Sequence, residues 1–280
     1  MNASPNIDLH THSTCSDGTL TPTELIARAA AAGVGVLALT DHDSTDGLES
    51  AWRAAASHSI QLVPGVELSA AWRSQDIHVL GLWIDPVNPA LQSLLERQVQ
   101  LRRERMMSIC RRLRRARLPG DALLAAVEAK GGIPTRSHLA DAMVAAGLVA
   151  RKDEAFRKYL AQGKVGHVPN DWPALPQTIC AIRGAGGVAV LAHPGRYRLS
   201  GGARRRLLEE FTQAGGGALE VLSGANGAQH VETCAALAIK YGLTGSVGSD
   251  FHSHEAAWNP LGRSLKLPDC ITPVWRGQLL

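Results

Sequence analysis

Apolar runs of strand length alternate with longer segments of helical pattern over the first third of the chain. We expect strands at residues 7–9, 36–40, 61–63 and 77–83, and helices at residues 21–32 and 47–58. Thr21 and Pro22 are typical of a helix start, and Gly33 is typical of a helix end. This alternation predicts a mostly parallel sheet, whose functional groups gather at the carboxyl ends of the strands.

The middle of the chain has a different pattern, which is helical and rich in arginine from Pro89 to about residue 173. Nine arginines stand against the single Glu104 between Arg97 and Arg117, and they cover more than one helical face. Shorter helices are expected at residues 121–130, 137–146 and 153–160, separated by glycine and proline. We interpret this segment as an α-helical insertion, a cap beside the mouth of an α/β barrel.

The alternating pattern returns after the insertion. Strands are expected at residues 188–192, 218–222 and 244–248, and helices at residues 176–184, 204–214 and 229–241. The resulting organisation is an interrupted α/β domain with seven strands. Its first part is predicted at residues 1–96, the insertion at 97–172 and its second part at 173–280.

The composition is that of an ordinary globular protein, with 280 residues of which 45% are hydrophobic and 19% charged. Residues 1–7 lack the features of a signal peptide, and no apolar run reaches the length of a membrane span. Five widely spaced cysteines form no C-x-x-C pair: Cys15, Cys110, Cys180, Cys234 and Cys270. We therefore expect reduced thiols and a cytoplasmic location. The net charge of +4 fits an anionic ligand without identifying one.

Residue types that commonly bind metals follow or occupy six of the predicted strands. His10 and His12 are two positions apart on extended backbone, so their imidazoles point to the same side. The full set is His10, His12, Asp17, Asp41, His42, Glu67, His78, His193, Asp250 and His252. Packing so many imidazoles and carboxylates together is costly unless a cation compensates, so we predict a metal site. We assign structural core positions instead to His58 and His230, which fall on predicted helices.

The motifs around these residues resemble the conserved blocks of the polymerase and histidinol phosphatase (PHP) family. The blocks are DLHTH at residues 8–12, TDH at 40–42, GVE at 65–67, HP at 193–194 and GSDFH at 248–252. Longer matches, RSHLA at 136–140 and AHPGRY at 192–197, resemble the subgroup of 3',5'-nucleotide bisphosphate phosphatases and 5'-3' exoribonucleases. The resemblance implies a distorted (β/α)7 barrel with an α-helical insertion domain and a site for three metal ions.

The resemblance also implies a ligand set for each ion. One ion would take His10, His12, Glu67 and Asp250; a second would share Glu67 and add His78 and His193; a third would take Asp17, His42 and His252. Other family members have a histidine where Asp17 stands. Mixed imidazole and carboxylate ligands suit manganese, which we expect first, and also iron or zinc.

The chemistry expected of such a site is hydrolysis of a phosphate ester. Clustered divalent cations acidify a water, neutralise phosphoryl oxygens and align the attacking and leaving oxygens. The catalytic candidates are Asp41, Asp250 and His252. Asp41 and Asp43 can orient ligands or protonate the leaving oxygen, and orientation is the preferred role. Cys15 has no motif for nucleophilic catalysis and receives no role.

The substrate-binding candidates are Arg136, Ser137, His138, Lys164 and Arg196. Arg136 and His138 match an Arg-x-His block of the subgroup, in which proline is common where Ser137 stands. A guanidinium is suited to bidentate phosphate recognition. The arginine run between Arg97 and Arg117 is either a guide for RNA or a solvated or self-associating helix face.

The sequence therefore predicts a metal-dependent phosphoesterase that removes the 3'-phosphate of nucleoside 3',5'-bisphosphates, with possible 5'-3' exonuclease activity on short RNA. Three alternatives stay open. Histidinol phosphate hydrolysis is the same chemistry on another leaving group. An amidohydrolase also begins with His-x-His, but usually uses a lysine ligand, and no predicted strand ends in lysine. A metal-stabilised RNA-binding module without catalysis would use the arginine-rich helix.

Overall fold

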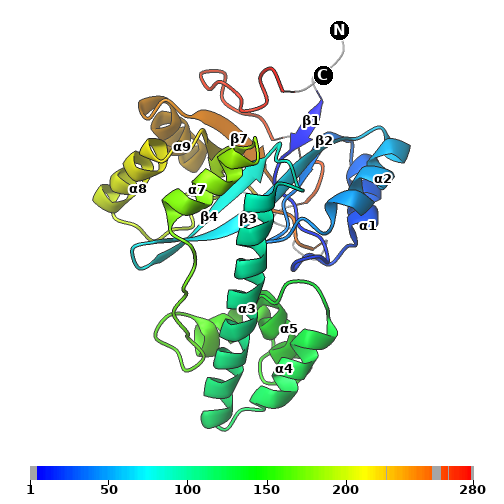
Figure 1. Ribbon diagram of the computed structural model, residues 1–280, viewed down its shortest axis with the longest axis vertical. Coiled ribbons are helices and arrows are strands. Elements are labelled where there is room, and N and C mark those ends of the chain that lie inside the picture. The colour runs from blue at the N-terminus through cyan, green and yellow to red at the C-terminus, as the bar shows by residue number, and fades with distance from the viewer. Residues whose placement is uncertain (1–4, 225, 254–259, 264, 279–280) are drawn as a thin grey trace.

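The computed structural model describes residues 5–224, 226–253, 260–263 and 265–278 (Figure 1). Within these ranges, seven strands form one sheet in the order of the sequence. They are β1 (Asn6–Asp8), β2 (Val34–Leu39), β3 (Gln61–Trp72), β4 (Gln75–Leu82), β5 (Val188–Leu191), β6 (Ala218–Ser223) and β7 (Thr244–Gly248). The backbone N–H of Leu9, just after β1, donates to Val247 O in β7 at 3.0 Å, so the sheet nearly closes on itself. This architecture confirms the predicted distorted seven-stranded barrel.

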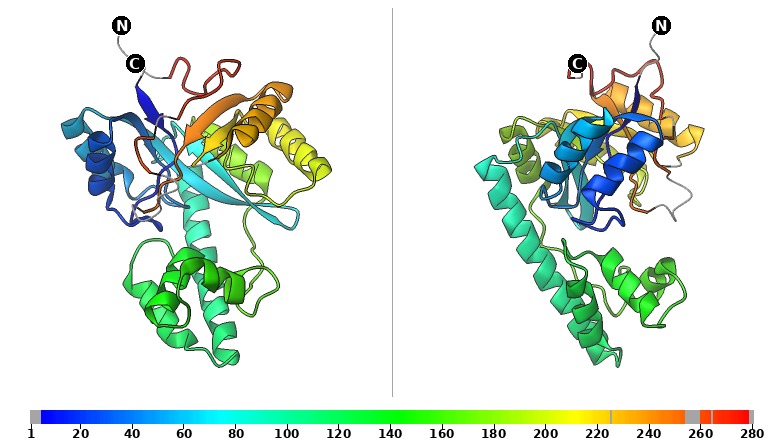
Figure 2. Two further views of the ribbon diagram at one scale, coloured as in Figure 1. Left: turned by 180° about the vertical axis from the view of Figure 1, so that it is seen from behind. Right: turned by 90° about the vertical axis from the view of Figure 1, so that its right-hand side faces the viewer.

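Five helices pack around the outside of the barrel (Figures 1 and 2). They are α1 (Pro22–Ala31), α2 (Leu48–His58), α7 (Leu175–Gly184), α8 (Gly201–Gln213) and α9 (Ala228–Lys240). The start of α1 is fixed by a capping box, in which Thr21 and Glu24 each accept a hydrogen bond from the other's backbone N–H. The predicted start signal at Thr21 therefore acts through these two reciprocal bonds.

The strand directions differ from a simple parallel sheet at β4. β3 continues to Trp72 and turns back as a hairpin, so that β4 runs antiparallel to both β3 and β5, while the other neighbouring pairs are parallel. The chain reverses at Arg73, which has a positive φ of 55°. Because β4 is reversed, its beginning lies at the same end of the barrel as the carboxyl ends of the parallel strands. His78 therefore reaches the site from near the start of its strand.

The helical insertion stands on one long helix. Its elements are α3 (Pro89–Arg115), α4 (Gly120–Ala129), α5 (Arg136–Ala145), α6 (Lys152–Ala155) and the π-helix η1 (Phe156–Leu160). The first half of α3 packs into the barrel core through Leu91 and Leu94, whereas Ile109 and Leu113 belong to a separate core inside the insertion. Helix α3 therefore crosses the predicted boundary between residues 96 and 97 without a break (Figure 1).

Buried polar contacts join the insertion to the barrel. On α3, Arg102 donates from Nε to Asp43 Oδ2 at 2.6 Å and from its terminal nitrogen to Ser69 Oγ at 2.9 Å. Gln98 Nε2 donates to Asp43 Oδ1 at 2.9 Å. The side chain of Asp43 is fully buried, and that of Arg102 is 9% exposed. These bonds fix the direction in which α3 leaves the barrel.

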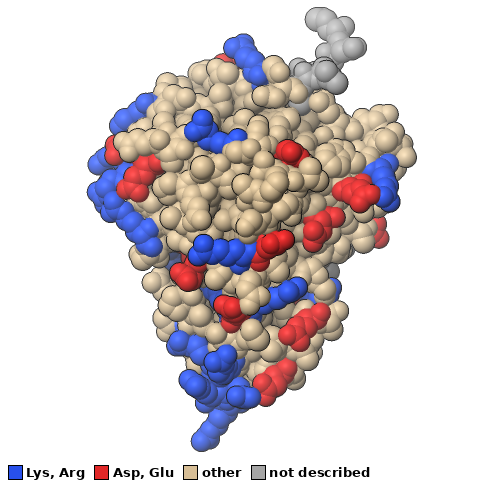
Figure 3. Space-filling view, viewed as in Figure 1, with Lys and Arg blue, Asp and Glu red and all other residues tan. Residues whose placement is uncertain are grey.

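The arginine run on α3 serves two different environments. Arg102 is buried at the joint and Arg105 is half-buried, but the arginines at the end of the helix are exposed. Figure 3 shows basic side chains gathered at the tip of the insertion, where this end of α3 lies. The unusual pattern in the sequence therefore reflects a helix that is anchored at one end and solvated at the other.

Two further observations bear on the chemical environment. No helix within the described ranges is long and apolar enough to cross a membrane. All five cysteines are free, and Cys110 and Cys234 are buried. Residues 1–4, part of the segment in which we expect no signal peptide, lie outside the described residues.

Candidate metal centre

The barrel mouth gathers the predicted ligand residues from six strands. His10 and His12 follow β1, His42 follows β2, and His193 follows β5. Two isolated parallel bridges, Thr11 with Phe251 and His42 with Glu67, continue the ladder beyond the ends of the strands. The backbone pairing of the barrel therefore extends into the site, and it sets the spacing of the side chains.

Glu67, which is fully buried, lies at the centre of the cluster. Its Oε2 is 3.4 Å from His10 Nε2, 3.2 Å from His12 Nε2 and 2.9 Å from His42 Nδ1. Its Oε1 is 2.9 Å from His78 Nδ1 and 3.0 Å from His193 Nε2. One carboxylate thus touches five imidazoles, which is the arrangement expected of a ligand shared between neighbouring cations.

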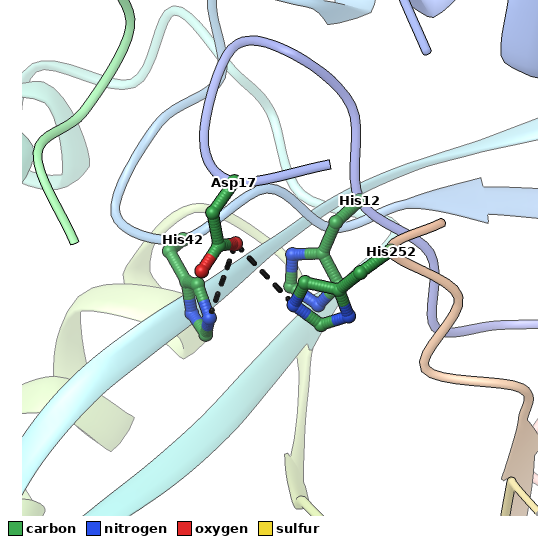
Figure 4. A group of neighbouring side chains, drawn as sticks. All are labelled: His12, Asp17, His42 and His252. Atoms are coloured by element: carbon green, nitrogen blue, oxygen red, sulfur yellow. Dashed lines mark ion pairs between the residues drawn. The ribbon is translucent and has the colours of Figure 1, made fainter. Parts of the chain in front are cut away.

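A second carboxylate, Asp17, faces three imidazoles at the open side of the cluster (Figure 4). Asp17 Oδ1 is 3.3 Å from His252 Nε2 and 3.7 Å from His42 Nε2. The ring of His12 stacks on that of His252 with centroids 4.0 Å apart. The loop after β1 therefore brings Asp17 back to residues that come from three different strands.

Among the residues that the structure describes, three groups of side chains have ligand atoms close enough to hold an ion. They are His10, His12, Glu67 and Asp250; His12, Asp17, His42 and His252; and His42, Glu67 and His78. The first group is the set expected for the first ion, and the second adds His12 to the set expected for the third. The last contains His42 where we expected His193, although His193 Nε2 contacts the same carboxylate oxygen as His78.

Several buried ligand atoms in this cluster have no hydrogen-bond partner. They are His10 Nε2, His12 Nε2, Asp17 Oδ1, His42 Nδ1, Glu67 Oε2 and His193 Nδ1. Leaving a buried polar atom unpaired costs about 1–3 kcal/mol, so six such atoms at one point require compensation. Bound cations would satisfy most of them at once, and the donor set therefore fits divalent metal ions.

Burial and neighbouring charges shift the pKa values of the cluster strongly. Burial opposes ionisation of Glu67, but the histidines around it, His42 first, hold its pKa well below the usual range. Burial also opposes protonation of His12, but the carboxylates of Asp250 and Glu67, each 3.2 Å from its Nε2, raise its pKa to about 10. Burial lowers the pKa of His42 to about 4. Without a cation, the cluster thus stores a proton on His12, and a bound metal ion would take the place of that proton.

Glu220 is a site residue that sequence reasoning missed. It is fully buried on β6, and its Oε1 is 2.9 Å from His10 Nδ1. Its Oε2 accepts the backbone N–H of His193 at 2.5 Å. Glu220 thereby leaves His10 Nε2 to face the other carboxylates. The available signal was a single acidic residue inside the apolar run 218–222.

The backbone is strained where two ligand residues leave their strands. His193 has a φ of 30° and Asp250 a φ of 54°, in a region that residues other than glycine seldom occupy. Glu220 holds the N–H of His193, and the N–H of Asp250 donates to His10 O at 2.8 Å. These bonds offset the strain and turn both side chains toward the cluster.

The contacts of Asp41 favour orientation over proton donation. Its Oδ1 accepts from Ser13 N at 2.7 Å and from Ser16 Oγ at 2.6 Å, and its Oδ2 accepts from Ser13 Oγ at 2.6 Å. Ser16 Oγ in turn lies 3.4 Å from His12 Nδ1. Asp41 therefore fixes the loop after β1 and supports His12 from behind.

A cavity of about 160 Å³ adjoins the cluster, between the barrel mouth and the insertion. Asp17, His42 and His78 line one side, and Arg102, Arg105, Arg136, Ser137, Phe156 and Trp172 are among the residues on the other. Burial, followed by the charge of Arg136, lowers the pKa of Arg105 to about 10, and burial lowers the pKa of Arg136 too. Such crowded positive charge favours an anion between these arginines and the cluster.

Three substrate-binding candidates lie at this cavity or beside it. Arg136 and Ser137 line the cavity at the start of α5. His138 instead caps that helix: its N–H donates to Thr135 Oγ1 at 3.2 Å, and its Nδ1 lies 3.4 Å from Thr135 N. The contacts that the structure gives His138 are therefore those of a helix cap.

The other two candidates lie farther out. Arg196 forms an ion pair with Asp250 and lines a larger groove that opens beside the cluster. Lys164 is exposed in the loop after η1, and it is not among the residues that line either space. His58 and His230 lie outside the cluster. His58 is exposed, so our prediction of a core position for it is wrong. His230 is half-buried, and its Nε2 lies 3.3 Å from Cys234 Sγ.

Comparison with known proteins gives relatives that span nearly the whole chain. A family model described as PHP domain matches residues 8–143. A protein of Salmonella typhimurium named 5'-3' exoribonuclease Rnm is 43% identical over 272 residues, covering 96% of this chain and 92% of its own. A protein of Chromobacterium violaceum named 3',5'-nucleoside bisphosphate phosphatase is 42% identical over 273 residues, covering 97% and 95%.

Solved structures have the same architecture. One from Chromobacterium violaceum, described as an amidohydrolase with bound sulfate and no metal, has a TM-score of 0.91 and 41% identity, covering 97% of this chain and 95% of its own. Another, from Bifidobacterium adolescentis and described as a candidate metal-dependent phosphoesterase, has a TM-score of 0.81 and 29% identity, covering 99% and 95%. The overall fold is thus shared with these chains.

Proposed function

The chain belongs to the PHP domain family of metal-dependent phosphoesterases, and within that family we propose that it removes the 3'-phosphate of nucleoside 3',5'-bisphosphates. We extend the proposal to 5'-3' exonuclease activity on short RNA. The observation that carries it is the pairing of two incomplete charge clusters across one cavity. Imidazoles and carboxylates suited to cations face buried and half-buried arginines suited to an anion.

The two activities break the same kind of bond. In a bisphosphate, water adds to the 3'-phosphorus and the 3'-oxygen leaves with a proton, giving a nucleoside 5'-phosphate and inorganic phosphate. In RNA with a 5'-phosphate, the same P–O3' cleavage releases the first nucleoside 5'-phosphate and leaves a new 5'-phosphate on the shortened chain. A site that holds a 5'-phosphate beside the reacting phosphorus therefore serves both substrates.

We propose three divalent ions, with manganese as the first to test, held by His10, His12, Asp17, His42, Glu67, His78, His193, Asp250 and His252. When bound, such ions would neutralise phosphoryl oxygens and make water more acidic. Neighbouring side chains of the protein orient the ligands and add charge. Glu220 and Asp41 orient His10 and His12, and Arg196, paired with Asp250, adds positive charge at the edge of the cluster.

The arginine side of the cavity would select for the second phosphate. Arg136 lies beside Ser137 at the start of α5, and Arg105 is steadied by two bonds from its guanidinium to Val168 O at 3.2 and 3.1 Å. A guanidinium and a hydroxyl together match a phosphate dianion. We propose that these groups bind the 5'-phosphate while the 3'-phosphate meets the metal cluster.

An assay panel tests this proposal with manganese, and with EDTA as a control. It contains a 3',5'-bisphosphate nucleotide, the matching 5'- and 3'-monophosphates, histidinol phosphate and a 5'-phosphorylated oligoribonucleotide. We expect the bisphosphate to be hydrolysed far faster than either monophosphate. Preference for histidinol phosphate would assign the alternative activity, and no turnover of any substrate by the metal-loaded protein would leave a binding module.

The Arg136→Ala variant tests the selecting residue. Removing a charge-assisted bond worth about 1.5–3 kcal/mol should lower kcat/KM for the bisphosphate by about a hundredfold, mainly through KM. Hydrolysis of the 3'-monophosphate should not change, because it carries no 5'-phosphate. Arg97→Ala, an exposed arginine on α3, is the matched control. Equal losses on both substrates would contradict recognition of the second phosphate.

We further propose a cytoplasmic location, supported by the five unpaired cysteines.

A further inference from the structure

A second and larger space opens beside the metal cluster. This groove of about 920 Å³ lies between the β3–β4 hairpin, the loop of residues 161–170 and the segment of residues 196–198. Pockets for small ligands usually measure about 300–1,000 Å³, so the groove is at the large end of that range. The cavity of about 160 Å³ described above is far smaller, and Arg136, Phe156 and Asp76 line both.

Arg196 and Tyr197, which line the groove, contact residues of the metal cluster. Arg196 pairs with Asp250, and the ring of Tyr197 lies 5.6 Å from that of His193. Tyr197 Oη also accepts the backbone N–H of His78 at 2.9 Å. From these anchored residues the segment continues outward to Arg198, which is exposed and lines the same groove.

The lining has the chemistry of a surface for single-stranded nucleic acid. Arginines outnumber acidic residues along it, with Arg73, Arg136, Arg196 and Arg198 against Asp76. Phe156 and Tyr197 supply aromatic side chains, and Asn170 Oδ1 is buried without a hydrogen-bond partner. Positive charge for the backbone and aromatic rings for the bases is the usual combination in such grooves.

We infer that this groove binds the part of an RNA chain that lies on the 3' side of the bond to be cleaved. The inference rests on the proposed function. With the 5'-phosphate in the small cavity and the reacting phosphorus at the cluster, the remaining nucleotides must leave through an open side. The groove adjoins the cluster through Arg196 and Tyr197, and its volume of about 920 Å³ leaves room for them. A mononucleotide bisphosphate has no nucleotide beyond the reacting phosphate, so it offers nothing for this groove to bind.

The Arg198→Ala variant tests the groove by comparing two substrates. We expect kcat/KM for a 5'-phosphorylated oligoribonucleotide to fall about tenfold, as for the loss of one charge-assisted contact, while bisphosphate hydrolysis stays unchanged. The dependence of log kcat/KM on log salt should also flatten by about 0.7, the value for one phosphate contact on a single strand. Arg206→Ala on α8, an exposed arginine outside the groove lining, should change neither substrate.

Other outcomes would overturn the inference. Equal losses on both substrates would mean that the groove holds the mononucleotide, and no loss on either would mean that RNA runs elsewhere. Wild-type protein that hydrolyses the bisphosphate but not the oligonucleotide would refute the groove and leave the phosphatase proposal standing. If wild-type protein hydrolyses neither, the proposed function fails. Fluorescence anisotropy with the labelled oligonucleotide in EDTA then tests the groove separately. Weaker binding by Arg198→Ala than by wild-type protein would support the inference, and equal binding, or no binding by either protein, would overturn it.

Discussion

The metal cluster at the barrel mouth faces three arginines of the insertion across the small cavity: Arg102, Arg105 and Arg136. The two groups are held in place in different ways. The ligands at the barrel mouth come from strand ends, where backbone pairing such as that between His42 and Glu67 sets their positions. Arg102, Arg105 and Arg136 come from two helices of the insertion, and they are packed against Trp172 and Phe156. The barrel thus fixes the positions of the ligand residues, whereas the insertion supplies the positive charge that faces them.

The largest expected effect comes from a substitution in the metal cluster at the barrel mouth. Glu67→Gln removes the charge that contacts five imidazoles, so the protein should lose metal and at least about a thousandfold in kcat/KM. Elemental analysis and the bisphosphate assay measure both quantities. Glu209→Gln, an exposed glutamate on α8, should keep metal and activity. Full metal content in Glu67→Gln would show that the centre is organised around another residue.

Breaking the joint between the two regions should affect stability more than chemistry. Arg102→Met leaves the buried carboxylate of Asp43 without its ionic partner, which should cost about 3–5 kcal/mol in the free energy of unfolding. Urea unfolding measures this loss, with Arg103→Met as the exposed neighbouring control. The double variant Arg102→Met/Asp43→Asn should recover most of it, because no buried charge is left. A single variant as stable as wild type would show that the pair does not hold the joint.

Lower pH should weaken metal binding at the barrel mouth, because protons compete with the metal ion for the imidazoles. Burial lowers the pKa of His10, but Glu220 and Asp250 raise it well above its usual value, and the pKa of His12 is raised to about 10. Both imidazoles therefore carry protons near neutral pH, and a metal ion must displace these protons to bind. Metal affinity should rise with pH from 6.5 to 8.5, by about tenfold per unit for each proton displaced. Chelator competition across this range measures the slope, and a flat profile would contradict proton displacement.

A smaller effect is expected from Glu220→Gln, which changes a residue behind the ligands. Weakening its hold on His10 and on the backbone of His193 should lower metal affinity about tenfold, at the lower end of the effect of such outer residues. Glu232→Gln on α9 is an exposed control. Chelator competition reads metal affinity directly, and unchanged affinity in Glu220→Gln would assign the residue to folding alone.

The sequence predicts the barrel side well because its rules are local. Strand-end histidines such as His10, His12 and His193 follow from period-two geometry and from the rule that sites gather at carboxyl ends. The structure brings all nine predicted ligands into one cluster. His78 is the instructive member, because its place near the start of a strand makes sense only once β4 is reversed.

The parts that could not be predicted depend on distant partners. The pair of Asp43 and Arg102 joins positions 59 apart in the chain, and Glu220 meets His10 across a separation of 210. Nothing in either local segment specifies the other. In the same way, the exposed His58 shows that a histidine on an amphipathic helix can lie on either face.

The contact of Asp43 with Gln98 and Arg102 also sets a condition for exchanging caps. The insertion leaves the barrel through α3 and returns near Pro173, whose O accepts the N–H of Ala71, so a replacement module has two points of attachment. A chimera that keeps this barrel but lacks a glutamine and an arginine at these two helix positions would leave Asp43 buried with an unbalanced charge. Successful grafts onto this scaffold will therefore be those that carry both residues one helical turn apart on the incoming helix.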